Sequence, residues 1–297
     1  MALKITKATD AIKVDRINVC IYAPPGIGKT SLAFTAADPI LLDFDQGAHR
    51  AVNRKDIVRV QTWGDAADMN ADDLADYKTV IVDTAGRALD ALTADIIRRN
   101  PKAGRGGALT LQGYGTLKAE FVAWLKALNS FGKDVILIAH MDEQRNGDDV
   151  VERLDVQGGS KGEIYKAADA MGRIAIVNGK RMLNFSPTDA AFGKNPGQLP
   201  PLEFPHPDKS PDFMATVMDS IKKKLNALTE EQQAAQTNLE EWRESIATLE
   251  AAEDFNNVLE AVKGQPASVK ALFAHAATAK GLTYDKAAGK YAVLEAA

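Results

Sequence analysis

The chain has little cysteine, no long apolar run and no excess of basic charge. Its single cysteine, Cys20, cannot form an intrachain disulfide, and its place in an apolar segment predicts a core residue in a reducing compartment. Because no run is apolar and long enough to span a bilayer, we expect no membrane partner. The first residues, Met1 to Lys4, contain no apolar signal segment, so we expect a cytoplasmic protein. The formal net charge of -4 excludes a basic nucleic-acid coat, so any contact with nucleic acid must come from local patches.

Strand-like and helical segments alternate up to about residue 140. Apolar runs predict strands at 17–22, 40–43, 57–61, 79–83 and 134–139, and helical spacing predicts helices at 29–37, 86–99 and 115–131. Two further predicted strands, 173–177 and 181–185, flank Asn178-Gly179, which is a strong hairpin signal. This alternation indicates an α/β fold with a mostly parallel sheet.

Proline marks a change in organisation. Half of the 12 prolines lie between Pro196 and Pro211, which predicts an extended connector without a helix or a central strand. Beyond it, the sequence predicts helices at 212–228, 229–251, 254–263 and 266–280. We therefore expect a core domain at 1–205 and a small, all-helical C-terminal region at 206–297. From Thr229 to Glu260 only Arg243 is basic, which excludes this stretch as a DNA-binding surface.

The most informative motif lies between the first predicted strand and the first predicted helix. It reads Ala23-Pro24-Pro25-Gly26-Ile27-Gly28-Lys29-Thr30 and is followed by Ser31. A strand, a glycine-rich loop and a helix form the context of a phosphate-binding loop, in which backbone N–H groups converge on phosphate oxygens. The usual pattern opens with glycine where this chain has Ala23, and an ordinary glycine turn before a helix is the alternative interpretation. We expect residues 23–31 to bind ATP.

Three side chains are predicted to act on the nucleotide and its metal. In such a loop Lys29 contacts the β- and γ-phosphates, and the Thr30 hydroxyl is a ligand of Mg²⁺. A second apolar run ends in Asp83, which fits a central strand whose carboxyl end faces the ligand. Asp83 is therefore predicted to hold Mg²⁺, and a turn-capping aspartate is the alternative. The expected cofactors are ATP and Mg²⁺.

The ordered set of motifs resembles the phage-encoded RecA-like P-loop ATPases of single-strand annealing and recombination. The resemblance covers roughly residues 15–205 and rests on the loop at 23–30 and on four later segments, which are Leu41–Gly47, Val80–Asp83, Ile136–His140 and Phe192–Asn195. It implies a RecA-like core, ATP hydrolysis that DNA stimulates, and assembly of the chain with itself as a ring or filament.

The resemblance also implies roles for individual residues. A carboxylate after the second strand would polarise the attacking water, and here this is Asp45, although glutamate is usual at that position; Asp43 is the reserve candidate. His140 would sense the γ-phosphate, with a hydrogen-bonded core histidine as the alternative. Lys194 would reach the nucleotide of a neighbouring subunit, unless it is a solvated loop lysine. Rival positions for this last role are Lys180 and Arg181.

Two loops are candidates for DNA contact, because the resemblance implies that loops in these regions line a central DNA path. The first, 98–107, has three glycines and no carboxylate, and its basic residues are Arg98, Arg99, Lys102 and Arg105. Beyond it, Tyr114 is a candidate for stacking on a base. The second, 143–166, is a long glycine-rich loop with Lys161 as its candidate contact. Ordinary surface loops are the alternative interpretation.

The leading hypothesis is an ATP-dependent enzyme that binds single-stranded DNA in recombination or annealing. The first alternative is a nucleotide switch that loads or remodels a protein partner without binding DNA. In either case the C-terminal helices are a candidate contact for a single-strand-binding protein or another replication or recombination protein. A second alternative, a small-molecule P-loop kinase with the 98–105 loop as its lid, is disfavoured by the predicted hairpin and the appended helices.

Overall fold

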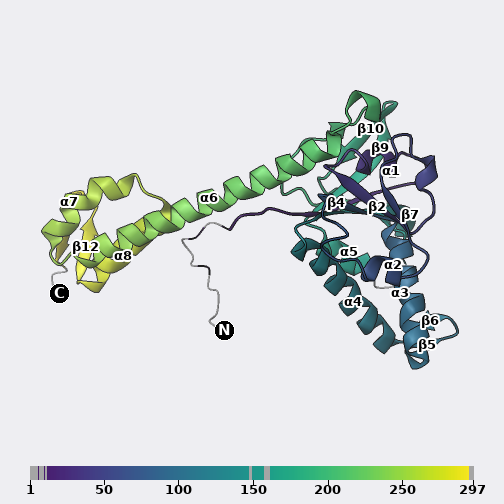
Figure 1. The fold of residues 1–297 in the computed structure, drawn as a ribbon. Helices are drawn as coiled ribbons and strands as arrows, with labels where there is room; N and C mark the ends of the chain where they lie inside the picture. Colours follow the sequence, from purple (N-terminus) through teal and green to yellow (C-terminus); the bar gives the residue numbers. More distant parts are fainter. Residues whose placement is uncertain (1–5, 7–9, 11, 147–148, 157–160, 294–297) are drawn as a thin grey trace. The chain divides into compact units, whose positions relative to one another are not determined.

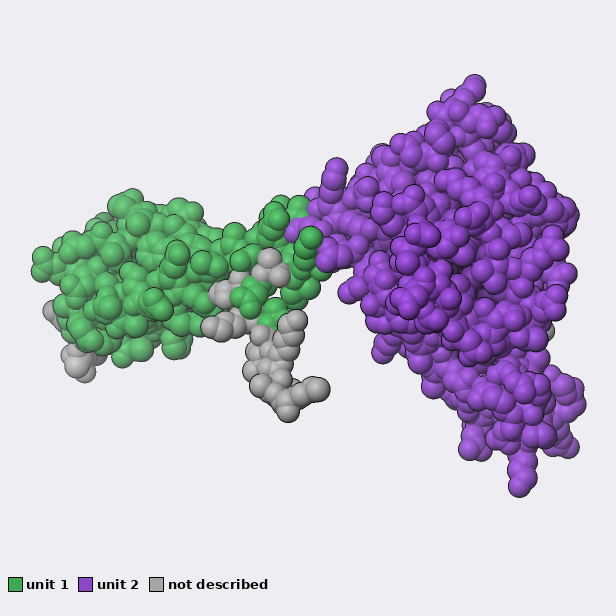
Figure 2. Space-filling model, in the orientation of Figure 1, with its two compact units in different colours: residues 1–13, 227–297 green, residues 14–226 purple. Residues whose placement is uncertain are grey.

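The structure, a computed structural model, describes residues 6, 10, 12–146, 149–156 and 161–293. The chain forms two compact units, residues 14–226 and residues 227–297 together with 1–13 (Figure 2). The sequence placed the boundary after residue 205, in the proline-rich connector. The division lies later because the first turns of the next helix pack into the core of the larger unit through Met214, Val217, Met218 and Ile221.

The larger unit is built on a mixed sheet with the strand order β11-β10-β9-β1-β7-β4-β2-β3 (Figure 1). The six parallel strands are β3 (Ile57–Arg59), β2 (Pro39–Asp43), β4 (Thr79–Asp83), β7 (Asp134–Asn146), β1 (Asn18–Ala23) and β9 (Ala170–Val177). Two antiparallel strands, β10 (Lys180–Asn184) and β11 (Leu202–Glu203), extend one edge, and β8 (Asp149–Leu154) pairs with the far end of β7. This is the mostly parallel RecA-like α/β core that the sequence predicted.

Both faces of the sheet are covered, and each strand contributes alternate residues to the two sides. In β1, Cys20 and Tyr22 belong to one apolar cluster, while Val19 and Ile21 belong to the other. The first cluster is completed by α2 (Gly64–Ala67), α3 (Ala85–Arg99), α4 (Leu111–Ser130) and α5 (Lys161–Ala167), and the second by α1 (Lys29–Ala33) and the start of α6 (Phe213–Ala247). Burial on both faces explains why the central strands read as unbroken apolar runs. Burial also raises the pKa of Cys20 to about 12, as expected for a core thiol.

Short elements complete the larger unit. They are the single 3₁₀ turns η1 (Ala48–Arg50), η2 (Pro101–Ala103) and η4 (Pro207–Lys209) and the small hairpin of β5 (Gly104–Arg105) and β6 (Ala108–Leu109). The proline-rich connector thus holds one turn of 3₁₀ helix and a two-residue edge strand.

The smaller unit has its own apolar core around Phe255 and Phe273. It contains the second half of α6, then α7 (Ala252–Lys263), α8 (Ala267–Ala279) and an antiparallel hairpin of β12 (Leu282–Asp285) and β13 (Lys290–Val293). The prediction of an all-helical C-terminal region was therefore wrong, and the two helices predicted at 212–228 and 229–251 are one. No helix in the described part of the chain combines the length and the apolar character that a bilayer crossing needs.

Candidate nucleotide-binding site

The glycine-rich loop connects β1 to α1, as the motif predicted. Gly26 and Gly28 have φ values of 79° and 102°, a region that side chains with a Cβ rarely adopt. A Cβ on Gly28 would also lie 2.9 Å from a guanidinium nitrogen of Arg181. Ala23, the departure from the usual glycine, is the last residue of β1, where its methyl group is fully buried in the core. The position therefore tolerates a small side chain.

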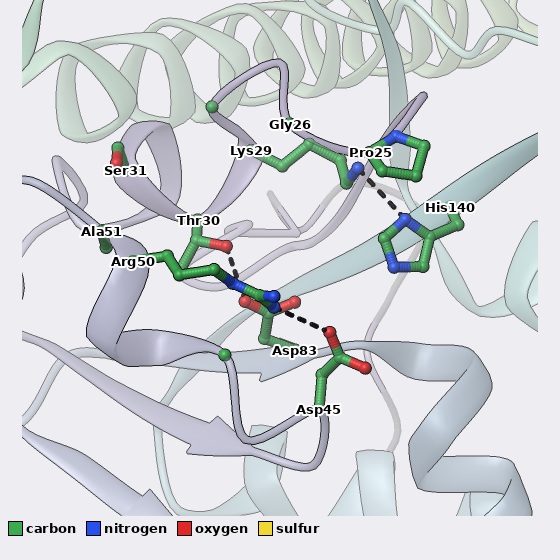
Figure 3. A pocket seen from close by; sticks show the side chains of 12 residues that line it. Pro25, Gly26, Lys29, Thr30, Ser31, Asp45, Arg50, Ala51, Asp83 and His140 are labelled. Carbon is green, nitrogen blue, oxygen red and sulfur yellow. Dashed lines mark hydrogen bonds and ion pairs between the residues drawn. The ribbon is translucent and has the colours of Figure 1, made fainter.

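A cavity of about 410 Å³ lies against this loop (Figure 3). It is lined by Pro25, Gly26, Gly28, Lys29, Thr30, Ser31, Asp45, Gly47, Arg50, Ala51, Asp83 and His140. Its size and its polar lining suit a nucleotide. Of the residues expected to bind ATP, Ala23, Pro24 and Ile27 are outside this lining: the first two contribute carbonyl oxygens that hold Lys29, and Ile27 packs against the core.

Lys29 is buried at the base of the cavity. Its ammonium donates hydrogen bonds to the carbonyl oxygens of Ala23 at 3.0 Å and Pro24 at 2.9 Å. Burial lowers the pKa of Lys29 to about 8, and the nearby carboxylate of Asp83 opposes that shift. A desolvated ammonium whose hydrogen-bond partners are uncharged gains strongly from an anionic phosphate.

Thr30 and Asp83 meet on the same side of the cavity. The Thr30 hydroxyl donates to a carboxylate oxygen of Asp83 at 2.7 Å, and burial raises the pKa of Asp83 to about 6. A hydroxyl and a buried carboxylate without a full cationic partner form the hard-oxygen donor pair that suits Mg²⁺. Among the described residues, no three His, Cys, Asp or Glu side chains gather into a metal site of their own. The pair therefore fits a metal that shares its coordination with nucleotide phosphates.

His140 lies between the loop and the acidic strand. Strand β7 pairs with β1 on one side and β4 on the other, so that His140 is opposite Ala23 in the register. The imidazole Nδ1 lies 3.3 Å from the Lys29 ammonium. Burial, and next the charge of Lys29, lower the pKa of His140, so the neutral ring accepts a hydrogen bond at Nδ1.

The two candidate bases have different surroundings. Asp43 is buried, and its carboxylate accepts hydrogen bonds from the backbone N–H groups of Gly47 at 2.9 Å and Ala48 at 3.1 Å. It therefore fixes the turn after β2, and its role as reserve base is not supported. Asp45 faces the cavity, and its backbone N–H donates to the Asp83 carbonyl oxygen at 3.1 Å. This contact ties the end of β2 to the end of β4.

The comparisons with known proteins agree with this geometry. The AAA domain family matches residues 15–196, which is more than half of the chain. The chain belongs to the AAA domain family. It therefore carries a P-loop ATPase domain of the AAA and RecA-like type.

More distant comparisons add little. One similar solved structure is a prototypical ATPase from the type III secretion system of pathogenic bacteria, with 12% sequence identity and a TM-score of 0.36. The match covers 54% of this chain and 51% of that chain, or about half of its length. So weak a likeness says nothing about substrate or partner. The comparison with curated proteins found no match.

Lys194 does not have the surroundings of a residue that reaches a neighbouring subunit of this AAA-domain ATPase. Its ammonium donates to the carbonyl oxygens of Tyr165 at 2.5 Å and Ala168 at 2.7 Å, at the C-terminal end of α5. Positive charge stabilises that end of a helix. Lys194 is thus engaged within its own subunit, which does not support the predicted contact with a neighbour's nucleotide. Of its rivals, Lys180 forms an ion pair with Glu203 at 2.6 Å, and Arg181 stacks on Phe204 at 4.8 Å beside the loop.

The first candidate DNA loop is an ordered hairpin, and two of its basic residues are paired. Arg98 and Arg99 both bind Asp95, at 2.5 Å and 2.7 Å, and Arg99 also binds Glu120 at 2.6 Å. Both arginines belong to the end of α3, so they are part of a helix and not of a loop. The carboxylates that pair with these arginines lie outside residues 98–107, so the charge of the segment alone does not reveal them.

The remaining candidates of this loop differ in exposure. Lys102 and Arg105 are exposed on η2 and on the β5–β6 hairpin. Tyr114 is half-buried and packs against the core cluster of α3 and α4, which does not support a base-stacking role. The described basic surface of the loop is thus reduced to Lys102 and Arg105.

The second candidate DNA loop is mostly regular structure. Strand β7 continues past His140 and pairs with β8 in an antiparallel ribbon, and α5 follows. Lys161 is the first residue of α5, and its side chain lies outside the described part of the structure.

The sequence reasoning missed Arg50, Gly47 and Arg87. Arg50 and Gly47 line the cavity, and both Arg50 and Arg87 approach Asp45. The proximity of Arg50 and Gly47 to the Asp43–Asp45 turn was a signal in the sequence. Nothing local pointed to Arg87, which begins the helix after β4.

Proposed function

We propose that this chain hydrolyses ATP and couples hydrolysis to the binding of single-stranded DNA in recombination or strand annealing. The observation that carries the first part is the convergence of Lys29, Thr30, Asp83 and Asp45 on one cavity. Asp45 lies across the cavity from Lys29 (Figure 3). When bound, Mg²⁺ would be held by Thr30 and Asp83 and would neutralise charge on the phosphates.

Each residue has a step in this scheme. Lys29 leaves the carbonyl oxygens of its own loop and binds the β- and γ-phosphates, where it stabilises the charge that develops in the transition state. Asp45 orients the attacking water and takes its proton as the bond from the γ-phosphorus to the bridging oxygen breaks. ADP and inorganic phosphate are the products.

Two elements connect this chemistry to the candidate DNA surfaces. When Lys29 moves to a phosphate, His140 loses a hydrogen-bond partner, and β7 continues from His140 into the β7–β8 ribbon. Helix α3 begins at Ala85, two residues after Asp83, and after 15 residues it reaches the turn that carries Lys102. These connections support coupling, because each is one continuous element between the cavity and a surface segment.

Hydrolysis is tested by ATP turnover with and without single-stranded DNA, combined with a measurement of particle size. We expect turnover that Lys29→Ala abolishes and that Asp45→Asn slows on the order of a hundredfold with nucleotide binding retained, as for a lost general base. Normal hydrolysis by Asp45→Asn would overturn the assignment of the base. Normal hydrolysis by a folded Lys29→Ala variant would overturn the assignment of the site.

The DNA surface is tested by the double substitution of Lys102 and Arg105 with alanine. We expect weaker single-strand binding and a log–log salt dependence that is shallower by roughly 0.7 for each lost phosphate contact. A charge-matched control replaces the exposed Arg54 and Lys55, which lie before β3, and should leave the slope unchanged. An unchanged slope for the hairpin variant would remove the hairpin from the DNA interface.

Assembly as a ring or filament is part of the proposal, since a head-to-tail contact would place each cavity beside a neighbour. Because Lys194 is engaged internally, the donor from the neighbour would be a different basic residue. Turnover per subunit should then rise with protein concentration. If turnover per subunit stays constant over the protein concentrations at which particle size grows, each subunit hydrolyses ATP without a contribution from its neighbour.

A partner-loading switch is the second candidate. The smaller unit has a core of its own, and from Thr229 to Glu260 its sequence is acidic with one basic residue, Arg243. Such a unit suits a protein partner better than a phosphate backbone. The two candidates separate in one experiment, because only the first predicts salt-dependent binding of an oligonucleotide that responds to ATP.

A further inference from the structure

Arg50 enters the nucleotide cavity from η1, opposite the glycine-rich loop. Its side chain reaches across the cavity toward Asp45, in front of Asp83 (Figure 3). A guanidinium nitrogen of Arg50 donates to the Asp45 carboxylate at 3.4 Å, and a nitrogen of Arg87 lies 3.6 Å from the other carboxylate oxygen. The carboxylate assigned as base therefore lies between two cations.

The backbone that carries Arg50 is fixed, whereas its guanidinium end is exposed. Asp43 fixes the turn before η1 through the N–H groups of Gly47 and Ala48. The Arg50 side chain folds back over Gly47 so closely that a Cβ there would lie 2.1 Å from a guanidinium nitrogen. The side chain is nevertheless 68% exposed. Gly47 thus leaves the space that the guanidinium occupies.

The contact with Asp45 is weak enough to be exchanged. At 3.4 Å it is longer than a usual charge-assisted hydrogen bond, and an exposed ion pair contributes little. A terminal phosphate offers more charge, and a pair of its oxygens can accept two parallel hydrogen bonds from a guanidinium. Arg50 is therefore expected to prefer a phosphate wherever one comes within its reach.

We propose that Arg50 is a ligand of the γ-phosphate from within the same subunit, and that it leaves Asp45 when ATP binds. The inference rests on the proposed function, since Asp45 must act on the water that attacks the γ-phosphorus. For the same reason Asp45 marks the γ-phosphate end of the cavity, and Arg50 touches Asp45. In the ADP state Arg50 remains with Asp45, so the base is released only when ATP is bound.

The test compares the affinities of Mg²⁺ complexes of a non-hydrolysable ATP analogue and of ADP. Arg50→Ala should weaken the analogue on the order of ten- to a hundredfold, the effect of one lost hydrogen bond to a charged group, and should change ADP affinity less than about threefold. Arg50→Lys should recover part of the loss, because it keeps the charge without the fork of donors. Arg54→Ala is the matched control and should bind both nucleotides normally.

Gly47→Ala is a second variant, which keeps the arginine at position 50 but changes the space available to its side chain. The added methyl group should displace the guanidinium and give a smaller loss with the same preference for the ATP analogue. If Arg50→Ala weakens the affinities for the ATP analogue and for ADP equally, Arg50 contacts another part of the nucleotide and the proposal is overturned. No loss for either nucleotide would overturn it as well.

The exchange itself is tested by coupling Arg50 to Asp45. Asp45→Asn should tighten binding of the analogue, and this gain should be smaller in the Arg50→Ala background because the competition for Arg50 is already gone. Equal gains in both backgrounds would contradict the exchange. These binding measurements need no turnover, so they are distinct from the hydrolysis test of Asp45→Asn. Normal hydrolysis by Asp45→Asn would remove Asp45 as the base, but it would not remove an ATP-selective contact of Arg50.

Discussion

At the scale of single residues, the site places charges in surroundings that disfavour them until a nucleotide arrives. Lys29 has a lowered pKa and Asp83 a raised one, and burial is the first cause of both shifts. Each charged form would be stabilised by the group that the residue itself is expected to bind, since phosphate favours the ammonium and Mg²⁺ favours the carboxylate. A bound phosphate and Mg²⁺ would therefore stabilise both charged forms.

The raised pKa of Asp83 predicts a pH-dependent stability. A carboxyl group whose pKa is higher in the folded state stabilises the fold fully below the unfolded pKa and loses that contribution as pH rises through the folded value. For Asp83 this window runs from the usual 3.8 to about 6. Asp83→Asn should therefore raise the melting temperature of the protein without nucleotide at pH 7.5, by a free energy on the order of 2–3 kcal/mol, and should raise it clearly less at pH 4.5, near the lower end of this window.

The same variant should lose Mg²⁺-dependent nucleotide binding, so stability and function would change in opposite directions. Thermal unfolding at the two pH values measures the first effect, and titration with Mg²⁺-nucleotide measures the second. Asp142→Asn, on the exposed ribbon, is the control and should change neither. A lower melting temperature for Asp83→Asn at pH 7.5 would show that the carboxylate is well satisfied in the empty site.

The residues of the loop could be predicted because their roles depend on adjacent sequence. The glycines, Lys29 and Thr30 occupy a strand–loop–helix context that the sequence shows directly, and the cavity forms beside them. Lys194 could not be assigned in this way, since its partners are carbonyl oxygens of α5, far away in the chain. Arg50 was not predicted because its role depends on where its side chain points, and no local sequence pattern indicates that direction.

At the scale of elements, strands buried on both faces were the easiest to predict. Their apolar runs are continuous, and the structure places β1, β2 and β4 within one residue of the predicted bounds. Strand β8 was missed because three of its six residues are charged, so it lacks the continuous apolar run that marks the central strands. The boundary predicted at 228/229 was wrong because neither glycine nor proline interrupts α6.

Two glycines near the start of helix α4, Gly113 and Gly115, differ in how closely they are packed. A Cβ on Gly113 would lie 2.4 Å from the Ala103 carbonyl oxygen, whereas a Cβ on Gly115 has no atom within 4 Å. Gly113→Ala should therefore destabilise the protein by about 1–3 kcal/mol, as overpacking does. Gly115→Ala should stabilise it by roughly 0.5–1 kcal/mol, since alanine is the better helix former.

Denaturant unfolding of both variants measures the difference. Ala103 belongs to the turn that leads into the β5–β6 hairpin, so Gly113→Ala should also shift the hairpin that carries Arg105. If both substitutions increase the free energy of unfolding, the packing of α4 against this turn is looser than the structure indicates.

At the scale of the whole molecule, the apolar cores are separate. The two clusters that sandwich the sheet draw on residues from Val14 to Leu225, and the cluster of the smaller unit begins at Trp242. Helix α6 contributes its first turns to the core of the larger unit and its end to that of the smaller unit. The ATPase machinery described above lies entirely in the larger unit.

A fragment of residues 12–230 should therefore fold and bind Mg²⁺-nucleotide with the affinity of the full chain. These ends keep the paired hydrogen bonds of Asn226 with the backbone of Val14, at 2.8 Å and 3.2 Å, which join the start of the unit to α6. Circular dichroism and nucleotide titration test the fragment directly, and the full chain should show an additional unfolding transition for the smaller unit. If DNA stimulates the fragment as strongly as the full chain, the smaller unit serves a protein partner, because the entire DNA response then resides in residues 12–230. If the fragment fails to fold while the full chain is stable, the two units depend on each other, and separate cores do not imply separate stability.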